Sequence, residues 1–116
     1  MIIRWEQGRA VIDDLLTKGR LDRVQPSGEL AEEMLARADR HLRSAKTLGD
    51  SADVEGAFSL TYDAARLALA ALLVNQGLRA KSGEGGHAVL LEVIHAQLQP
   101  PPDKIFTQFD WIRRMR

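Results

Sequence analysis

Residues 53–77 read DVEGAFSLTYDAARLALAALLVNQG, and this stretch decides the fold. It predicts one long helix over residues 53–76, which ends at Gly77 because glycine is the residue that most often follows a helix. The second half of this helix is apolar nearly all round, and a helix with that pattern is buried. We therefore expect it to be the central element of the protein.

Two helices are predicted before this central one. The clearer of the two covers residues 28–48, where apolar residues recur with a period near 3.6 for five turns, and Ser27 is placed as its N-cap. The other covers residues 3–18 and ends at Gly19. The predicted inward residues are Trp5, Ile12, Leu15 and Leu16 in the first helix and Leu30, Met34, Ala38, Leu42, Ala45 and Leu48 in the second.

Two further helices are predicted after it, over residues 87–98 and 103–116, and Pro100–Pro102 separates them. We expect no strands, because no alternating apolar run exceeds three residues. The prediction is a single all-α domain over residues 1–116, an up-and-down bundle of four to five helices.

The last predicted helix has an apolar stripe formed by Ile105, Phe109 and Ile112, and Arg116 falls on the centre of that stripe. A buried cation needs solvent, a carboxylate or a bound anion beside it. A cleft between two protomers would give Arg116 access to solvent or to a bound anion. In a two-fold interface the same surface of each protomer meets its copy, so one apolar stripe is enough to form it. We therefore expect a homodimer in which these helices meet.

Composition excludes several classes of function. The chain has 16 Lys plus Arg and 16 Asp plus Glu, so no overall field draws it to nucleic acid or membrane. It has no cysteine, which excludes disulfides, thiolate metal sites and a cysteine nucleophile. Its longest apolar run, residues 67–74, is far below the ~20 residues that cross a bilayer. We expect a cytoplasmic protein with no membrane contact.

Motifs for a metal or a nucleotide cofactor are incomplete. Glu92-x-x-His95 and Glu84-x-x-His87 have the spacing of di-iron ligands, but those sites need the two pairs on different helices. Residues 81–86, KSGEGG, lack the order of a phosphate loop, and Glu84 repels an anion. We therefore expect no metal, no cofactor and no nucleotide hydrolysis.

Tyr62 has two interpretations, and His41 has one. Tyr62, beside Asp63 and Arg66, is either a buried tyrosine that hydrogen-bonds to a neighbouring element or a residue with a catalytic or base-stacking role. His41 is predicted to be a surface histidine on the solvated face of its helix. No Ser/His/Asp trio or carboxylate pair can be assembled, so no catalytic residue is predicted.

The segment TYDAARLALAALLVNQGLRAKSGEGGHAVLLEVI, residues 61–94, resembles the central part of a HEPN domain. In that family a long helix carries an aromatic residue followed by small and apolar ones. A loop with a basic residue comes next, and a histidine then opens the following helix. The matching residues are Tyr62, Ala65, Ala68, Leu69, Leu72, Leu73, Lys81, His87 and Leu91.

The resemblance implies a helical bundle that dimerises through its last helices. Family members act as metal-independent ribonuclease toxins with an Arg-x4–6-His motif, or as partners of a small nucleotidyltransferase that restrains them. Here Arg113 or Arg116 would supply the arginine, and no histidine follows. Three residues separate Arg37 from His41 and seven separate Arg79 from His87, so neither pair fits. Either the sequence stops before the motif is complete, or the protein belongs to a non-catalytic branch.

Two functions of different class remain. The first is a dimeric module of a toxin–antitoxin or defence system that binds RNA or a nucleotide without catalysis. Its candidate binding residues are Arg113, Arg116, Tyr62, Lys81 and His87. The alternative is a helical adaptor that docks a protein partner through Ile105, Phe109 and Ile112. Binding of RNA would weaken in salt, and binding through the apolar stripe would not.

Overall fold

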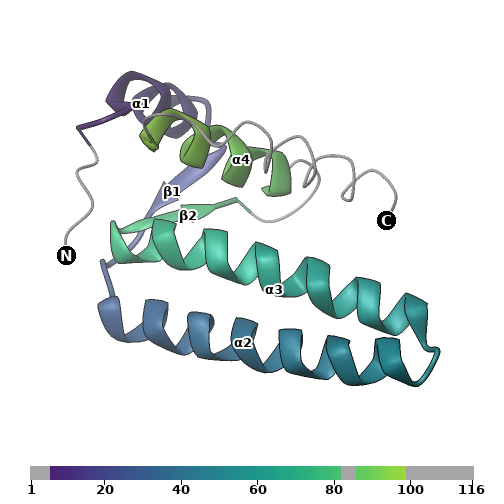
Figure 1. Ribbon diagram of the computed structural model, residues 1–116. Helices are drawn as coiled ribbons and strands as arrows, with labels where there is room; N and C mark the ends of the chain where they lie inside the picture. The colour runs from purple at the N-terminus through teal and green to yellow at the C-terminus, as the bar shows by residue number, and fades with distance from the viewer. Residues whose placement is uncertain (1–5, 82–85, 99–116) are drawn as a thin grey trace.

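The computed structural model describes residues 6–81 and 86–98, and this part of the chain holds four helices and one small sheet (Figure 1). In chain order the elements are α1 (Arg9–Thr17), β1 (Leu21–Arg23), α2 (Gly28–Asp50), α3 (Val54–Asn75), β2 (Leu78–Ala80) and α4 (Gly86–Gln97). The expected all-α architecture is confirmed. Of the predicted helices, the one over residues 103–116 lies outside the described residues.

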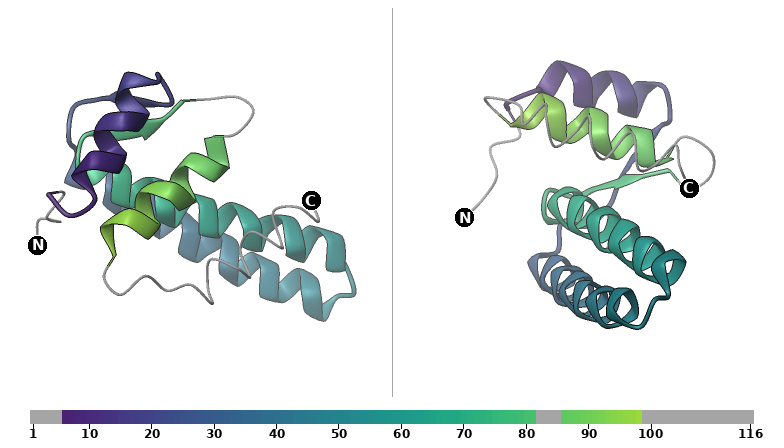
Figure 2. Two further views of the ribbon diagram at one scale, coloured as in Figure 1. Left: turned by 90° about the horizontal axis from the view of Figure 1, so that it is seen from above. Right: turned by 45° about the vertical axis from the view of Figure 1, so that its right-hand side comes forward.

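The elements form two layers (Figure 2). α2 and α3 make a long antiparallel hairpin, and α1 lies beside α4 over the end of that hairpin where α3 finishes. The sheet lies between the layers. The C-terminal half of α3 therefore contacts both layers.

Side chains cap the two long helices. The Ser27 hydroxyl accepts a hydrogen bond from the Leu30 N–H at 3.0 Å, which is the N-cap that the sequence indicates for α2. The Asp53 carboxylate accepts one from the Gly56 N–H at 3.0 Å and caps α3. α1 begins at Arg9, later than the sequence suggested, because residues 6–8 form a turn.

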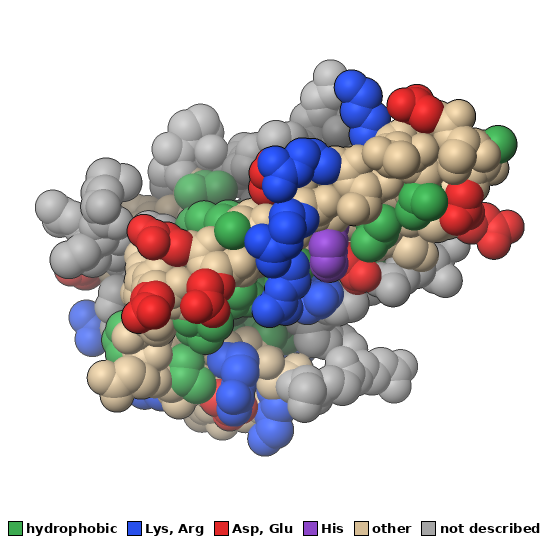
Figure 3. Space-filling model, turned by 90° about the horizontal axis from the view of Figure 1, so that it is seen from below, with side chains coloured by type: hydrophobic (Ala, Val, Ile, Leu, Met, Phe, Trp, Pro, Cys, Tyr) green, Lys and Arg blue, Asp and Glu red, His purple; other side chains and the backbone are tan. Residues whose placement is uncertain are grey.

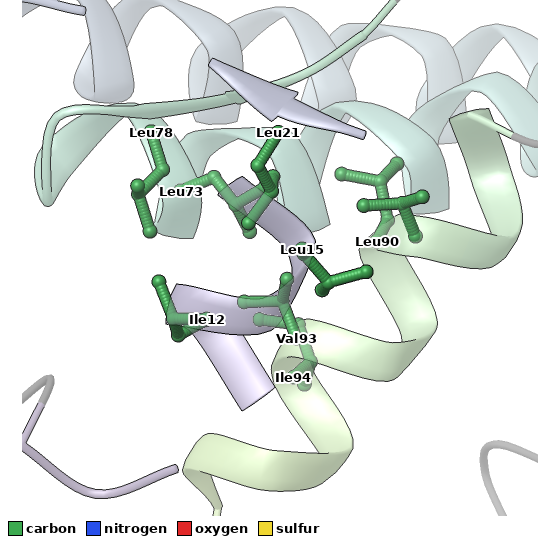
Figure 4. Packing of buried hydrophobic residues seen from close by; sticks show 9 residues of the cluster. Ile12, Leu15, Leu21, Leu73, Leu78, Leu90, Val93 and Ile94 are labelled. Atoms are coloured by element: carbon green, nitrogen blue, oxygen red, sulfur yellow. The ribbon is translucent and has the colours of Figure 1, made fainter. Parts of the chain in front are cut away.

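The main core lies between the two layers (Figure 4). Ile12 and Leu15 of α1 face Val93 and Ile94 of α4, and Leu73 reaches them from α3. These side chains are almost fully buried, and burial of an aliphatic side chain stabilises the fold by roughly 1.5–3 kcal/mol. The core therefore joins the first and last described helices to the end of the central one.

A pair of glutamines closes the end of this core. The Gln76 amide donates to the Gln97 carbonyl oxygen at 2.9 Å, and the Gln97 amide donates back at 2.6 Å. Gln97 is buried, so its amide needs this partner in place of water. The pair fixes the end of α4 against the end of α3.

Small residues form the seam between α2 and α3. Ala31, Ala38 and Ala45 recur every seven residues and are buried. Leu30 and Leu42, which the sequence placed inward, are 42% and 49% exposed, so this part of the prediction is wrong. Alanines at a helix contact allow a short interaxial distance, and the leucines then lie at the edges of the seam.

The two-stranded sheet contradicts the expectation that the chain has no strands. β1 pairs with β2 antiparallel, with Leu21 opposite Ala80 and Arg23 opposite Leu78. Each strand has three residues, too few for an alternating pattern to be read from sequence. Pairing here depends on the core, since Leu21 and Leu78 are buried between the layers.

By length and composition alone, α3 is the one helix in the described part of the chain that could cross a membrane. Its mean hydropathy reaches 1.4 over an 18-residue window, of which 33% is buried in this structure. The core helix of a protein that never enters a bilayer has the same properties. Part of the apolar surface of α3 is buried against α2 and α4.

The turn after α3 generates a stability prediction. Gly77 has φ = +80°, and a Cβ there would lie 2.9 Å from the Val24 carbonyl oxygen and from Pro26 Cγ. We expect Gly77→Ala to lower the free energy of unfolding by about 3 kcal/mol, because strain at positive φ and a steric clash add together. Urea denaturation measures this change.

Gly19 provides the matched control. It has φ = +70°, but no atom lies within 4 Å of a Cβ at this position. Gly19→Ala should therefore lower the free energy of unfolding by only about 1 kcal/mol, through strain alone. Equal losses in the two variants would show that the contact between Gly77 and the segment before α2 does not matter.

Candidate functional site

A groove of about 690 Å³ opens where α2, α3 and the sheet meet. Its walls are the N-terminal half of α2, the C-terminal half of α3, the segment before α2, and β2 with the residue that follows it. Leu90 of α4 closes one end. The lining residues are Val24, Gln25, Ser27, Leu30, Met34, Arg66, Ala70, Leu73, Val74, Leu78, Arg79, Ala80, Lys81 and Leu90.

The floor of the groove is apolar. It includes Leu30 and Met34 from α2 and Ala70 and Val74 from α3. Leu30 is exposed because it lies at the edge of the alanine seam, and this position brings it into the groove. A concave, mostly apolar surface with a few polar groups is the usual form of a small-molecule site.

Three cations supply the charge. Arg66 comes from α3, Arg79 from β2, and Lys81 directly follows β2. Lys81 is held in place by its backbone, since its N–H donates to the Arg20 carbonyl oxygen at 3.1 Å. The groove therefore combines an apolar floor with a positive rim.

The ion pairs of the two arginines are long. Arg66 Nε lies 3.9 Å from Asp63 Oδ1, and Arg79 Nη2 lies 3.6 Å from Asp22 Oδ2. These side chains are 30% to 69% exposed, and exposed pairs contribute about 0–1 kcal/mol. Lys81 is exposed and forms no ion pair within residues 6–81 and 86–98. Each cation can therefore turn to an incoming anion at little cost.

The N-terminus of α2 adds to the positive potential of the groove. Its N-cap Ser27 is one of the lining residues. The N–H groups of a first helical turn and the helix dipole both favour an anion nearby. This contribution supplements that of the three side chains.

The structure places few of the residues that the sequence singled out for binding. Lys81 lies in the groove, whereas Tyr62 is buried at 2% exposure and does not line it. This burial agrees with the packing interpretation of Tyr62. His87 belongs to the first turn of α4, but its side chain is outside what the structure describes. Outside the described residues lie Arg113, Arg116, Ile105, Phe109 and Ile112.

Sequence reasoning missed Arg66 and Arg79 as site residues. Arg79 lies on a strand that was not predicted, and Arg66 lies thirteen positions earlier on a helix, so only the folded chain brings them to one groove. The sequence does show basic residues, Arg79 and Lys81, just after the predicted helix 53–76. It does not show that they lie on the same face of the protein as Arg66.

His41 was also described incorrectly from the sequence. It is partly buried, and its Nδ1 is enclosed with no hydrogen-bond partner among the described residues. The expectation of an ordinary surface histidine is therefore wrong. Its helix packs so closely on α3 that the ring is held at the edge of the seam.

The Glu92-x-x-His95 spacing has a different use in the folded chain. Glu92 Oε1 lies 3.6 Å from Arg20 Nη1, so this carboxylate takes part in an ion pair between α4 and the start of β1. Within the described residues, no group of three or more His, Cys, Asp or Glu side chains could hold a metal ion. That the protein binds no metal stays a prediction.

The sequence model of the HEPN domain family matches residues 31–116, which is most of the chain. The chain belongs to the HEPN domain family. The match begins within α2 and includes α3, β2 and α4, so every helix that lines the groove belongs to the HEPN domain. No significant match was found among curated proteins or among solved structures.

This HEPN domain has three histidines, and none follows an arginine with four to six residues between them. Cleavage of RNA without a metal needs a base for the 2′-hydroxyl as well as a cation for the phosphate. We therefore expect RNA cleavage by this chain at background level, measured on end-labelled RNA by gel electrophoresis. Rapid cleavage that His87→Ala abolishes would contradict this prediction and would show that another histidine serves as the base.

Proposed function

We propose that this HEPN domain binds RNA without cleaving it, with one nucleotide unit held in the groove between α2, α3 and the sheet. The observation that carries the proposal is the combination of an apolar floor and three cations in one groove. A nucleotide has the same two parts, a flat ring system and a phosphate.

The size of the groove suits this ligand. Its volume of about 690 Å³ lies within the range of roughly 300–1,000 Å³ found for small-molecule sites. The face of a base can stack on the apolar surface formed by Leu30, Met34 and Ala70. All bases have such a face, so we expect the groove to have only a weak preference for one base over another.

The phosphate is assigned to the rim of the groove. Guanidinium groups bind phosphate oxygens in a bidentate manner, and an ammonium group binds them as a point charge. Arg66 and Arg79 would exchange weak carboxylate contacts for a phosphate, and Lys81 would gain its first ionic partner within the described part of the chain. The rim thus supports binding of a phosphate ester.

Family membership supports a wider proposal. We infer that the protein acts as a homodimer in a toxin–antitoxin or defence system, with a small nucleotidyltransferase as its protein partner. The inference rests on the HEPN match and on the predicted apolar stripe of Ile105, Phe109 and Ile112. A cytoplasmic location is part of the same proposal.

Reversing the charge of Lys81 tests the groove. Lys81→Glu should weaken binding of both adenosine monophosphate and a short RNA about tenfold, or about 1.4 kcal/mol, because it places a carboxylate where the phosphate binds. Fluorescence anisotropy with labelled ligands measures the two affinities. Ala70→Phe, which fills the floor without a change of charge, should weaken both ligands as well.

Lys18→Glu is the matched control. Lys18 is an exposed lysine of the α1 layer that pairs with Asp14 at 2.9 Å, and it does not line the groove. Its reversal makes the same change in net charge and should leave both affinities within about twofold. Equal losses for Lys18→Glu and Lys81→Glu would show that the attraction is general, and the groove would then not be the site.

The dimer is tested at the predicted last helix. Phe109→Glu should yield monomers with unchanged helicity, because it places a carboxylate in the apolar stripe. Arg114→Glu, on the opposite side of that predicted helix, should leave the dimer intact. Sedimentation velocity measures the association state, and a native protein that is monomeric at tens of micromolar would contradict the proposal.

A further inference from the structure

The cations of this protein differ in how they are used. Most of those in the described residues form ion pairs: Arg9, Lys18, Arg20, Arg43, Arg66 and Arg79. Arg37, Arg40 and Lys46 are exposed and form no ion pair within residues 6–81 and 86–98, as is also true of Lys81 in the groove. Three exposed cations without an ion pair in the described part of the chain therefore lie on a single helix, α2.

These residues form a regular file along α2. Arg37, Arg40, Arg43 and Lys46 are each three positions apart. Each step of three residues advances about 4.5 Å along a helix and turns back about 60° around it. The side chains therefore make one oblique band across the outer face of α2. Figure 3, which views the molecule from the side of α2, shows Lys and Arg side chains in such a band.

Charge is segregated along α2. Glu29, Glu32 and Glu33 occupy its first two turns, whereas residues 36–48 carry four cations and one carboxylate, Asp39. Acidic side chains near a helix N-terminus complement the dipole, so the glutamates have a structural explanation. The cations lie mostly in the middle of the helix, where the dipole does not account for them.

The band begins beside the groove. Met34 lines the groove and also packs on the cluster that contains Ala38 and Leu67. Arg37 lies one turn after Met34, at the level of the hairpin where α3 carries Arg66. The positive rim of the groove therefore continues onto the outer face of α2.

We propose that this band, formed by Arg37, Arg40, Arg43 and Lys46, is a second contact surface for RNA. It binds the phosphates of the strand that continues beyond the nucleotide in the groove, so the inference rests on the proposed function. A single file of cations matches a linear polyanion, and phosphate contacts position a strand without reading its bases.

A double variant isolates the band. Arg40→Gln/Lys46→Gln removes two charges that form no ion pair with the described residues, and glutamine preserves helix propensity, so the melting temperature should not change. We expect about tenfold weaker binding of a single-stranded RNA of about 15 nucleotides, and a salt slope reduced by roughly 1.4. Binding of adenosine monophosphate should be unchanged, because one nucleotide does not reach the band.

Arg9→Gln/Lys18→Gln is the matched control, since it removes two exposed cations from α1. It should bind the long RNA within about twofold of the native protein. If it weakens binding as much as the band variant does, the effect is one of net charge and the inference is overturned. A band variant that binds the long RNA as the native protein does would also overturn it.

These outcomes separate the band from the groove. If Lys81→Glu weakens binding of both ligands and the band variant weakens binding of neither, the groove proposal is supported and the band inference is wrong. If the band variant weakens binding of the long RNA but Lys81→Glu changes the affinity for neither ligand, the band inference is supported and the groove proposal is wrong. A polyglutamate peptide that competes with RNA and loses affinity in the band variant to the same extent would assign the band to an acidic protein.

Discussion

The C-terminal half of α3 packs against two different surfaces at once, and the rest of the structure depends on this constraint. Ala71 and Val74 contact α2, whereas Leu73, between them, reaches the core that holds α1 and α4. A helix that buries opposite faces must be apolar nearly all round, as this segment is. This stretch of the chain therefore joins the two layers, and its end fixes where β2 begins.

The form of the groove follows from the way α2 meets α3. Alanines at the seam let the two helices approach closely, so that Leu30 and Met34 lie at the edge of the contact rather than within it. The small sheet then closes the end of the hairpin and brings Arg79 and Lys81 to that edge. An apolar floor and a positive rim thus arise from one packing arrangement.

Charge in this protein has two separate uses. Pairs such as Asp39–Arg43 and Asp14–Lys18 lie one turn apart on a helix and add a few tenths of a kcal/mol to helix stability. Arg37, Arg40 and Lys46 of α2 form no such pair with any residue that the structure describes. A net charge of zero therefore conceals a surface on which positive charge is concentrated, and a local field of this kind can attract a polyanion that the whole molecule does not.

The sequence by itself determined the helical class, the burial of α3, the N-cap at Ser27 and membership of the HEPN family. These features rest on periodicity, capping and local composition, which a single segment carries within itself. The sequence of α2 has both leucines and alanines at helical spacing, so it did not show which of them face α3. In the folded protein α3 packs closely on α2, and the alanines are the residues buried between the two helices. Only the tertiary structure decided this, and it also decided the sheet and the groove. β1 pairs with β2 because Leu21 and Leu78 are buried in a core built by distant helices. Arg66 and Arg79 reach one site only when α3 and β2 fold together, and no short segment contains that information.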